Sequence, residues 1–239
     1  STATAVYGCI EGILNKKRVI FISKSNLEGN FINTVMKAGQ DYMVMNNYWI
    51  FVPINTSNID KYEELRKHLN IPKRISDENG GIYIIDFSVR DSNYQELSVK
   101  HREALNKQII ALIHERFEFL HSNAPNIRKK VETMTFDDKV IIIDEVHNLT
   151  NGMTKEKSVA SELYKIFMNA KNSKFIFLTG TPIINIVFET SKLFNILRGP
   201  IDIITFKILV NFDLPIDYKR IRSQFKQNRY VDQIVINSV

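Results

Sequence analysis

The chain has 239 residues, of which 44% are hydrophobic and 24% are charged, a composition that is ordinary for a globular protein. No apolar run is long enough to cross a bilayer and the first residues lack a signal-peptide pattern, so we expect no membrane partner. The single cysteine, Cys9, excludes an internal disulfide framework and fits a reducing compartment. The net charge of +6 permits a nucleic-acid partner without requiring one.

The chain opens with a helical pattern over residues 1–14, and the apolar run 19–22 predicts a buried strand. The polar turn Ser23-Lys24-Ser25 follows this strand and leads into an amphipathic helix that ends near Gly39. A helix N-terminus beside Ser and Lys suits contact with a phosphate group. Helix capping is the plain alternative, because Ser and Asn are favoured caps in any case.

Residues 40–100 read as a variable insert and carry the weakest pattern. Residues 42–52 favour a strand or hairpin, residues 60–69 a short helix, and residues 82–87 another strand. Aromatic side chains here could stack on bases, but buried packing is the commoner fate of such residues.

The clearest helical pattern covers residues 102–120, and residues 121–126, which include Asn123, break it. Residues 127–134 carry a basic face, for which a solvated charge run is the plain alternative. The histidines in this region lack metal-ligand spacing, so we expect surface or capping roles for His101, His114 and His121.

Residues 140–143 form an unbroken β-branched run that ends in Asp144 and Glu145. Such runs are typical of a strand buried on both faces of a parallel sheet, and chemistry in these sheets lies just past the carboxyl ends of the strands. Paired carboxylates at that point suit metal-dependent phosphoryl chemistry, in which one holds Mg²⁺ through water and the other orients or deprotonates an attacking water. A strand that happens to end in an acidic turn is the alternative.

A second apolar strand at residues 174–178 ends in Thr179-Gly180-Thr181, and a helical pattern at residues 159–169 lies between the two strands. This order predicts a right-handed crossover and adjacent parallel strands. We therefore expect His147 and the two threonines at the same edge of the sheet. Further on, the patterns favour a helix at 184–197, a strand at 201–210, a basic helix at 218–229 and a short strand at 231–236.

The pair D-E-V-H and L-T-G-T-P, in this order and each at a strand end, resembles motifs II and III of superfamily 2 helicases and translocases. The form T-G-T-P-x-x-N is similar to the Swi/Snf-type branch. Together with L-E-G-N-F-I-N and L-F-N-I-L-R-G, these strings resemble helicase-like ATPases of large cytoplasmic DNA viruses. That group includes the poxvirus early transcription factor small subunit and its giant-virus relatives.

The resemblance implies an α/β fold: a RecA-like three-layer sandwich with a mostly parallel central sheet, the first motor domain of a superfamily 2 helicase truncated at both ends. Residues 1–200 would form this domain, and residues 201–239 would begin a linker or second domain. The phosphate-binding string G-x-x-x-x-G-K-S/T and a Q-x-x-G-R-x-x-R-like string do not occur in the 239 residues. We therefore expect these residues alone to bind nucleotide poorly and to be inactive.

The resemblance also implies a nucleic-acid-dependent ATPase, a helicase or translocase that couples hydrolysis of ATP, with Mg²⁺, to binding or remodelling of DNA in viral transcription. Asp144 would bind Mg²⁺ through water, and Glu145 would act as the base for the attacking water. Coupling would fall to His147, Thr179, Gly180 and Thr181. Ser1 and Thr2, together with Asp144 and Glu145, would contact the nucleotide and its Mg²⁺. Contacts to nucleic acid would come from Ser23, Lys24, Ser25 and Asn123.

The implied partners are nucleic acid, DNA more than RNA, and a viral RNA polymerase or transcription factor subunit. The implied location is the virion and the viral factory of the host cytoplasm. A nuclease with Asp144 and Glu145 as metal ligands is one alternative, but it would need a further carboxylate and a lysine for which the sequence offers no convincing set. The other is a non-catalytic scaffold that binds DNA or a polymerase, which would have no need for Glu145.

Overall fold

The computed structural model describes residues 18–39, 41–54, 59–155, 157–181 and 187–199, with isolated residues at 219, 222, 223 and 235. The chain divides into two units, Ser1–Pro200 and Ile201–Val239, and every element below belongs to the first. The elements expected over residues 1–14 and, for the most part, after residue 200 lie outside the described residues. Among the described helices, none combines the length and the apolar character that a membrane crossing requires.

Within the described residues, four parallel strands form the central sheet in the order β4-β1-β5-β6. They are β1 (Val19–Ser23), β4 (Phe117–His121), β5 (Val140–Asp144) and β6 (Lys174–Leu178). All of β1 and the first four residues of β5 are buried, which explains why their apolar runs are unbroken. The sheet confirms the predicted α/β fold, and the crossover from β5 leads to an adjacent parallel β6 as expected.

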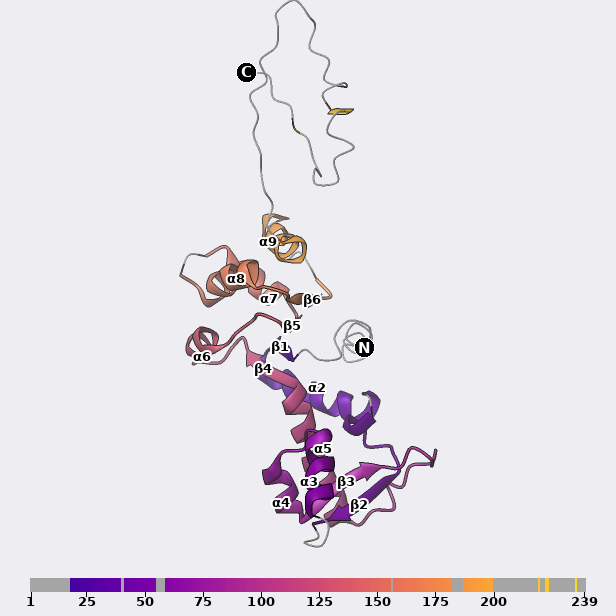
Figure 1. Cartoon of the computed structure of the whole chain (residues 1–239). Coiled ribbons are helices and arrows are strands. Elements are labelled where there is room, and N and C mark those ends of the chain that lie inside the picture. The colour runs from indigo at the N-terminus through magenta and orange to yellow at the C-terminus, as the bar shows by residue number, and fades with distance from the viewer. Residues whose placement is uncertain are drawn as a thin grey trace, which may run out of the picture. The chain divides into compact units, whose positions relative to one another are not determined.

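Helices cover both faces of the sheet. Successive residues of a strand point to opposite sides, and in β1 and β5 both sets of side chains are apolar, so each face must be covered. On one face, Phe21 and Ile142 pack with α2 (Ser25–Ala38) and α5 (Val99–Arg116). On the other face, Ile22 and Ile143 pack with α6 (Ile127–Thr133), α7 (His147–Met153), α8 (Val159–Asn169) and α9 (Val187–Arg198). Figure 1 shows α2 and α5 below the sheet and α7, α8 and α9 above it, so the three-layer arrangement of a RecA-like fold is present.

The helix expected over residues 102–120 ends earlier than its pattern indicates. Helix α5 stops at Arg116, and Phe117–His121 is strand β4 at the edge of the sheet. Phe117 lies in the extended region, although its N–H still bonds to the carbonyl of Ile113 in the helix. Its ring and that of Phe119 contact Phe31 of α2, with centroids 5.1 and 5.9 Å away. Aromatic residues pack well on a pleated surface, so pairing with β1 overrides the local helical pattern.

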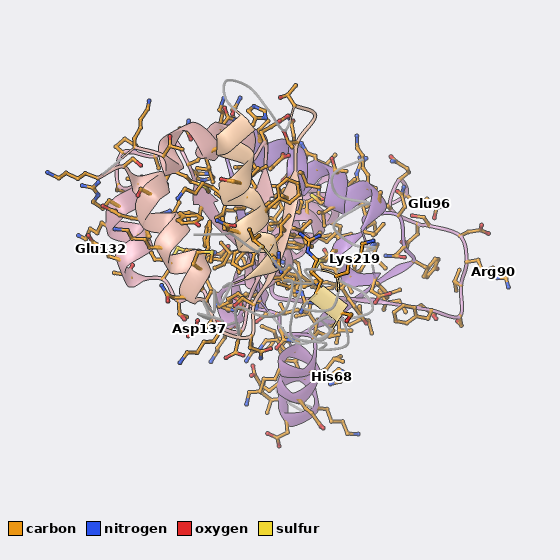
Figure 2. All side chains as sticks on the ribbon, turned by 90° about the horizontal axis from the view of Figure 1, so that it is seen from above. His68, Arg90, Glu96, Glu132, Asp137 and Lys219 are labelled. Atoms are coloured by element: carbon orange, nitrogen blue, oxygen red, sulfur yellow. The ribbon has the colours of Figure 1, made fainter. Side chains whose placement is uncertain are left out.

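Residues 41–98, which we call the hairpin lobe, contain a two-stranded antiparallel sheet and short helices. Its strands are β2 (Trp49–Pro53) and β3 (Gly81–Ile85), and its helices are η1 (Asp41–Met43), α3 (Ile59–His68) and α4 (Lys73–Asn79). Figure 1 shows β2, β3, α3 and α4 gathered around one end of α5, away from the central sheet. The strands and the helix expected within the insert are therefore present. In Figure 2, Arg90 and Glu96 mark the loop that projects between β3 and α5.

Two side-chain amides hydrogen-bond to the outer backbone edges of β2 and β3, the edges that the two strands do not use to pair with each other. Asn93 accepts a hydrogen bond from the backbone N–H of Trp49 and donates one to its carbonyl, at 2.8 and 2.9 Å. Gln108 of α5, which is completely buried, does the same for Tyr83 at 2.9 and 2.8 Å. Each amide therefore replaces the backbone of a neighbouring strand, and Gln108 fixes the lobe to α5.

Candidate functional site

The predicted catalytic residues lie where β5 meets α7. Asp144 is the last residue of β5, Glu145 and Val146 form a turn, and His147 begins α7. The turn is tied to the neighbouring strand because the N–H of Val146 donates to the carbonyl of Leu178 at 3.1 Å. The carboxyl ends of β5 and β6 therefore form one continuous edge.

His147 joins the two strand ends through its side chain. Its Nδ1 atom lies 2.8 Å from the Thr179 hydroxyl and 3.3 Å from the Thr181 hydroxyl. The same Nδ1 lies 3.2 Å from Oε2 of Glu145. The strand order thus brings His147 and both threonines together as expected, and the contact of His147 with Glu145 is one that sequence reasoning missed. Gly180 lies between the threonines and is exposed.

The environment of Asp144 favours a neighbouring cation. Burial raises the pKa of this carboxyl group above its ordinary value of 3.8, and the negative charge of Glu145 raises it further. The backbone N–H of Glu145, which donates to Oδ1 of Asp144 at 3.1 Å, acts in the opposite direction. A divalent cation would offset both unfavourable effects, and Mg²⁺ prefers hard oxygen ligands such as this carboxylate. The described residues hold no group of three or more His, Cys, Asp or Glu side chains that could enclose a metal ion, so Asp144 would hold Mg²⁺ through water rather than within a cage of protein ligands.

The backbone of Glu145 has an unusual conformation that the neighbouring residues hold in place. Its φ of 50° lies in the left-handed region, which is uncommon for residues other than glycine. Its carbonyl accepts two hydrogen bonds from Asn148, one from the backbone N–H at 2.9 Å and one from the side-chain amide at 3.0 Å. These bonds fix the backbone while the carboxylate stays exposed. The string D-E-V-H-N contains Asn148, but nothing in its spacing indicated this role.

The residues expected to contact nucleic acid also come together. The backbone N–H of Ser25 donates to Oδ1 of Asn123 at 3.0 Å, and the amide of Asn123 lies 3.3 Å from the Ser25 hydroxyl. Lys24, Ser25 and Asn123 are exposed, so the start of α2 and the loop after β4 form one polar surface. Ser23 is only 2% exposed and its hydroxyl donates to the carbonyl of Lys24 at 3.1 Å, so it supports this turn from beneath.

Contacts of Glu28 with two histidines beside this surface were not expected from the sequence. Nε2 of His121, at the end of β4, lies 2.9 Å from Oε2 of Glu28 in the first turn of α2. Nε2 of His114 lies 4.0 Å from the other oxygen of Glu28. These contacts link α2 to α5 and β4, and the large sequence separation between Glu28 and the histidines explains why no pattern indicated them. Ser1 and Thr2, predicted to contact nucleotide, lie outside the described residues.

Comparison with known proteins agrees with the motifs. The "Termination factor NPH-I homolog" of an African swine fever virus isolate from a South African tick is 32% identical over an alignment 121 residues long, which covers 46% of this chain and 17% of that protein. The counterpart from a Kenyan pig isolate is 36% identical over 94 residues, 37% of this chain and 13% of its own length. The "Putative helicase 087L" of Invertebrate iridescent virus 3 is 32% identical over 108 residues, 44% of this chain and 10% of its own length.

No family model matches the chain. The matched stretches span between 10% and 17% of the length of these relatives. The relatives come from large DNA viruses, and their names describe a termination factor and a helicase. The chain is therefore related to the helicase-like proteins of large DNA viruses, as its motifs indicate.

Proposed function

We propose that the chain carries part of a nucleic-acid-dependent ATPase, a helicase or translocase that couples ATP hydrolysis to binding or remodelling of DNA in viral transcription. The observation that supports this most is the contact of His147 with Thr179 and Thr181 across two strand ends. In this proposal, residues 1–200 belong to the first motor domain and residues 201–239 begin a linker or second domain. The names of the relatives support the same class of protein.

Asp144 and Glu145 divide the proposed chemistry between them. Mg²⁺, when bound through water at Asp144, supplies positive charge that neutralises phosphate oxygens. The exposed carboxylate of Glu145 orients and deprotonates the attacking water, and its fixed backbone keeps it beside Asp144. Burial of Asp144 strengthens its attraction for a cation, because a lower local dielectric strengthens charge interactions.

Coupling arises from the way the two strand ends are joined. The Val146–Leu178 backbone bond and the His147–Thr179 contact connect the turn after β5 to the turn after β6. A displacement of residues 179–181 therefore changes the surroundings of Glu145, and the reverse also holds. Such a connection is what a motor needs in order to link the state of its nucleotide to the position of its nucleic acid.

The polar surface of Lys24, Ser25 and Asn123 is the proposed contact for the nucleic-acid backbone. A lysine beside a helix N-terminus attracts phosphate, and contacts of this kind carry little sequence information. We propose DNA more than RNA as the ligand, and a viral RNA polymerase or transcription factor subunit as a partner. The proposed location is the virion and the cytoplasmic viral factory, which fits relatives from large DNA viruses.

The test is the ATPase rate of the natural protein that contains these residues, measured with and without duplex DNA. Glu145→Gln should lower DNA-stimulated turnover by roughly 100-fold or more while nucleotide binding persists, because it removes the base but keeps the shape. Glu132→Gln is the matched control, since Glu132 is exposed on α6 (Figure 2) and should change nothing. Absence of turnover in the unmodified protein, with DNA binding retained, would refute the motor and favour the scaffold.

Binding of DNA is tested separately by fluorescence anisotropy at several salt concentrations. Lys24→Ala should weaken binding at all sequences and reduce the slope of log affinity against log salt by about 1. Lys37→Ala removes another exposed lysine, in the last turn of α2, and serves as the control. Equal effects of the two substitutions would contradict a specific contact at Lys24.

A further inference from the structure

We propose that the loop at residues 86–98 of the hairpin lobe is a docking surface for another protein, with Phe87 as its apolar anchor. The partner that fits is a protein with a basic segment, in which an apolar side chain lies between lysine or arginine residues. This inference goes beyond the proposed function and does not depend on ATP hydrolysis.

Phe87 presents an aromatic ring to solvent from a packed base. It is 69% exposed, and Val89 in the same turn is 38% exposed. The ring of Phe87 meets that of Tyr42 edge-on with centroids 6.1 Å apart, and Tyr42 meets Trp49 in the same way at 6.0 Å. Trp49 is buried, so the three rings lead from the core of the lobe to its surface. Single apolar side chains are common on protein surfaces, but a supported aromatic ring is what the centre of a protein interface uses.

The loop is fixed at both ends. The carboxylate of Asp86 accepts hydrogen bonds from the backbone N–H and the hydroxyl of Ser88, at 2.9 and 2.6 Å. The N–H of Val89 donates to the carbonyl of Asp86 at 3.3 Å. Further along, Tyr94 is buried and its hydroxyl donates to Oδ1 of Asn106 in α5 at 3.0 Å. A fixed loop loses little conformational freedom when a partner binds, so more of the contact energy remains as affinity.

The charge of the lobe indicates the kind of partner. Residues 41–98 contain nine Asp and Glu and six Lys and Arg, a net charge of −3, whereas the chain as a whole carries +6. Within the loop, Asp91 and Glu96 are exposed beside a single basic residue, Arg90 (Figure 2). Surfaces that stack bases combine aromatic rings with a positive groove, so an acidic lobe disfavours that role for Phe87. Opposite charges guide association, and the loop therefore suits a basic protein segment.

The first experiment selects peptides from a displayed random library on the natural protein, with Phe87→Ser as the counter-target. We expect enriched sequences in which an apolar residue lies between Lys or Arg residues. A selected peptide should bind Phe87→Ser about tenfold more weakly by fluorescence anisotropy. Phe194→Ser is the matched control, because Phe194 of α9 is 67% exposed, and it should leave the affinity unchanged. The inference is overturned by no enrichment, by neutral or acidic sequences, or by equal losses in the two variants.

The second experiment tests the charge of the loop with the same peptide. Asp91→Asn combined with Glu96→Gln removes two exposed carboxylates and keeps the shape of both side chains. Affinity should fall by about fivefold at low salt, and this difference should shrink as salt rises, because salt screens exposed charges. Glu64→Gln combined with Asp77→Asn removes the same charge from α3 and α4 of the lobe and should have a smaller effect. Equal losses in the two double variants would contradict a contact at the loop.

Two further measurements on Phe87→Ser separate other occupants of this surface. Weaker binding to single-stranded DNA than in the unmodified protein would replace the protein partner by nucleic acid. A mass that falls from dimer to monomer in light scattering would replace it by a second copy of the chain. We expect neither value to change.

Discussion

Replacing Gln108 by leucine tests whether side-chain amides hold the hairpin lobe on α5. The leucine keeps a similar size and apolar character, but it leaves the backbone N–H and carbonyl of Tyr83 without their partners. Both groups are in a region closed to water, because Gln108 is 0% and Tyr83 2% exposed. The substitution therefore removes two hydrogen bonds without creating a large cavity.

The magnitude can be worked out from the cost of unpaired buried groups. Each costs about 1 to 3 kcal/mol, and the extra apolar burial of leucine recovers about 1 kcal/mol. We expect a net loss of about 3 kcal/mol in the free energy of unfolding of the chain, with the lobe unfolding together with the central sheet. With a urea m-value of about 3 kcal/mol per molar for a chain of this size, the unfolding midpoint falls by about 1 M.

Fluorescence of Trp49 provides a local assay, because it is the only tryptophan in the chain, is 3% exposed and lies in the lobe. The urea midpoint from this signal should fall in Gln108→Leu. Lys107→Leu, at the exposed neighbouring position of α5, should stay within about 0.5 kcal/mol of the unmodified chain. An unchanged midpoint for Gln108→Leu would refute the reasoning, since Tyr83 would then have other means of satisfying its backbone groups.

Two further substitutions test packing and charge. Gly81→Ala should lower the free energy of unfolding, measured in urea, by at least about 2 kcal/mol, because a Cβ would overlap the Val52 carbonyl and lie 2.6 Å from the ring of Phe51. Gly29→Ala in α2 is the control: its Cβ meets no atom within 4 Å, so the substitution should stabilise the chain. Asp144→Asn should raise the unfolding midpoint at pH 7, because the ionised carboxylate is penalised in the folded state. Since the folded pKa is raised, this gain should shrink as pH falls toward 3.8 and vanish below it, and a gain that is constant across this range would contradict the assignment.

The parts of the fold that could be predicted are those in which local pattern and tertiary role agree. Helix α8 spans Val159–Asn169, the range that its apolar spacing indicates, and Ser158 caps it through the N–H of Ser161 at 3.0 Å. Strand β5 is buried on both faces and reads as an unbroken apolar run. Strand β4 was missed because its residues continue the helical spacing of α5, and only pairing with β1 distinguishes the two possibilities.

In the candidate site, too, some contacts could be predicted from local pattern and others could not. The spacing of D-E-V-H and T-G-T-P was enough to expect His147 beside Thr179, because two adjacent parallel strands fix where their ends lie. The contact between Glu145 and His147 occurs where Glu145 has a left-handed backbone, which the residue type does not indicate. Contacts such as Glu28 with His121 depend on packing between distant segments, which one sequence does not reveal.

The amides of Asn93 and Gln108 also block the edges of the two-stranded sheet against pairing with a strand of another chain. An exposed strand edge is a template for a further strand, and proteins protect such edges against aggregation. Here a new strand could pair at Trp49 or Tyr83 only by displacing an amide that already makes two hydrogen bonds there. Protection at Tyr83 comes from α5 and lasts only while the lobe stays packed on that helix. Local unfolding of the lobe would therefore expose the edge of β3 and make the chain prone to aggregate before the central sheet opens.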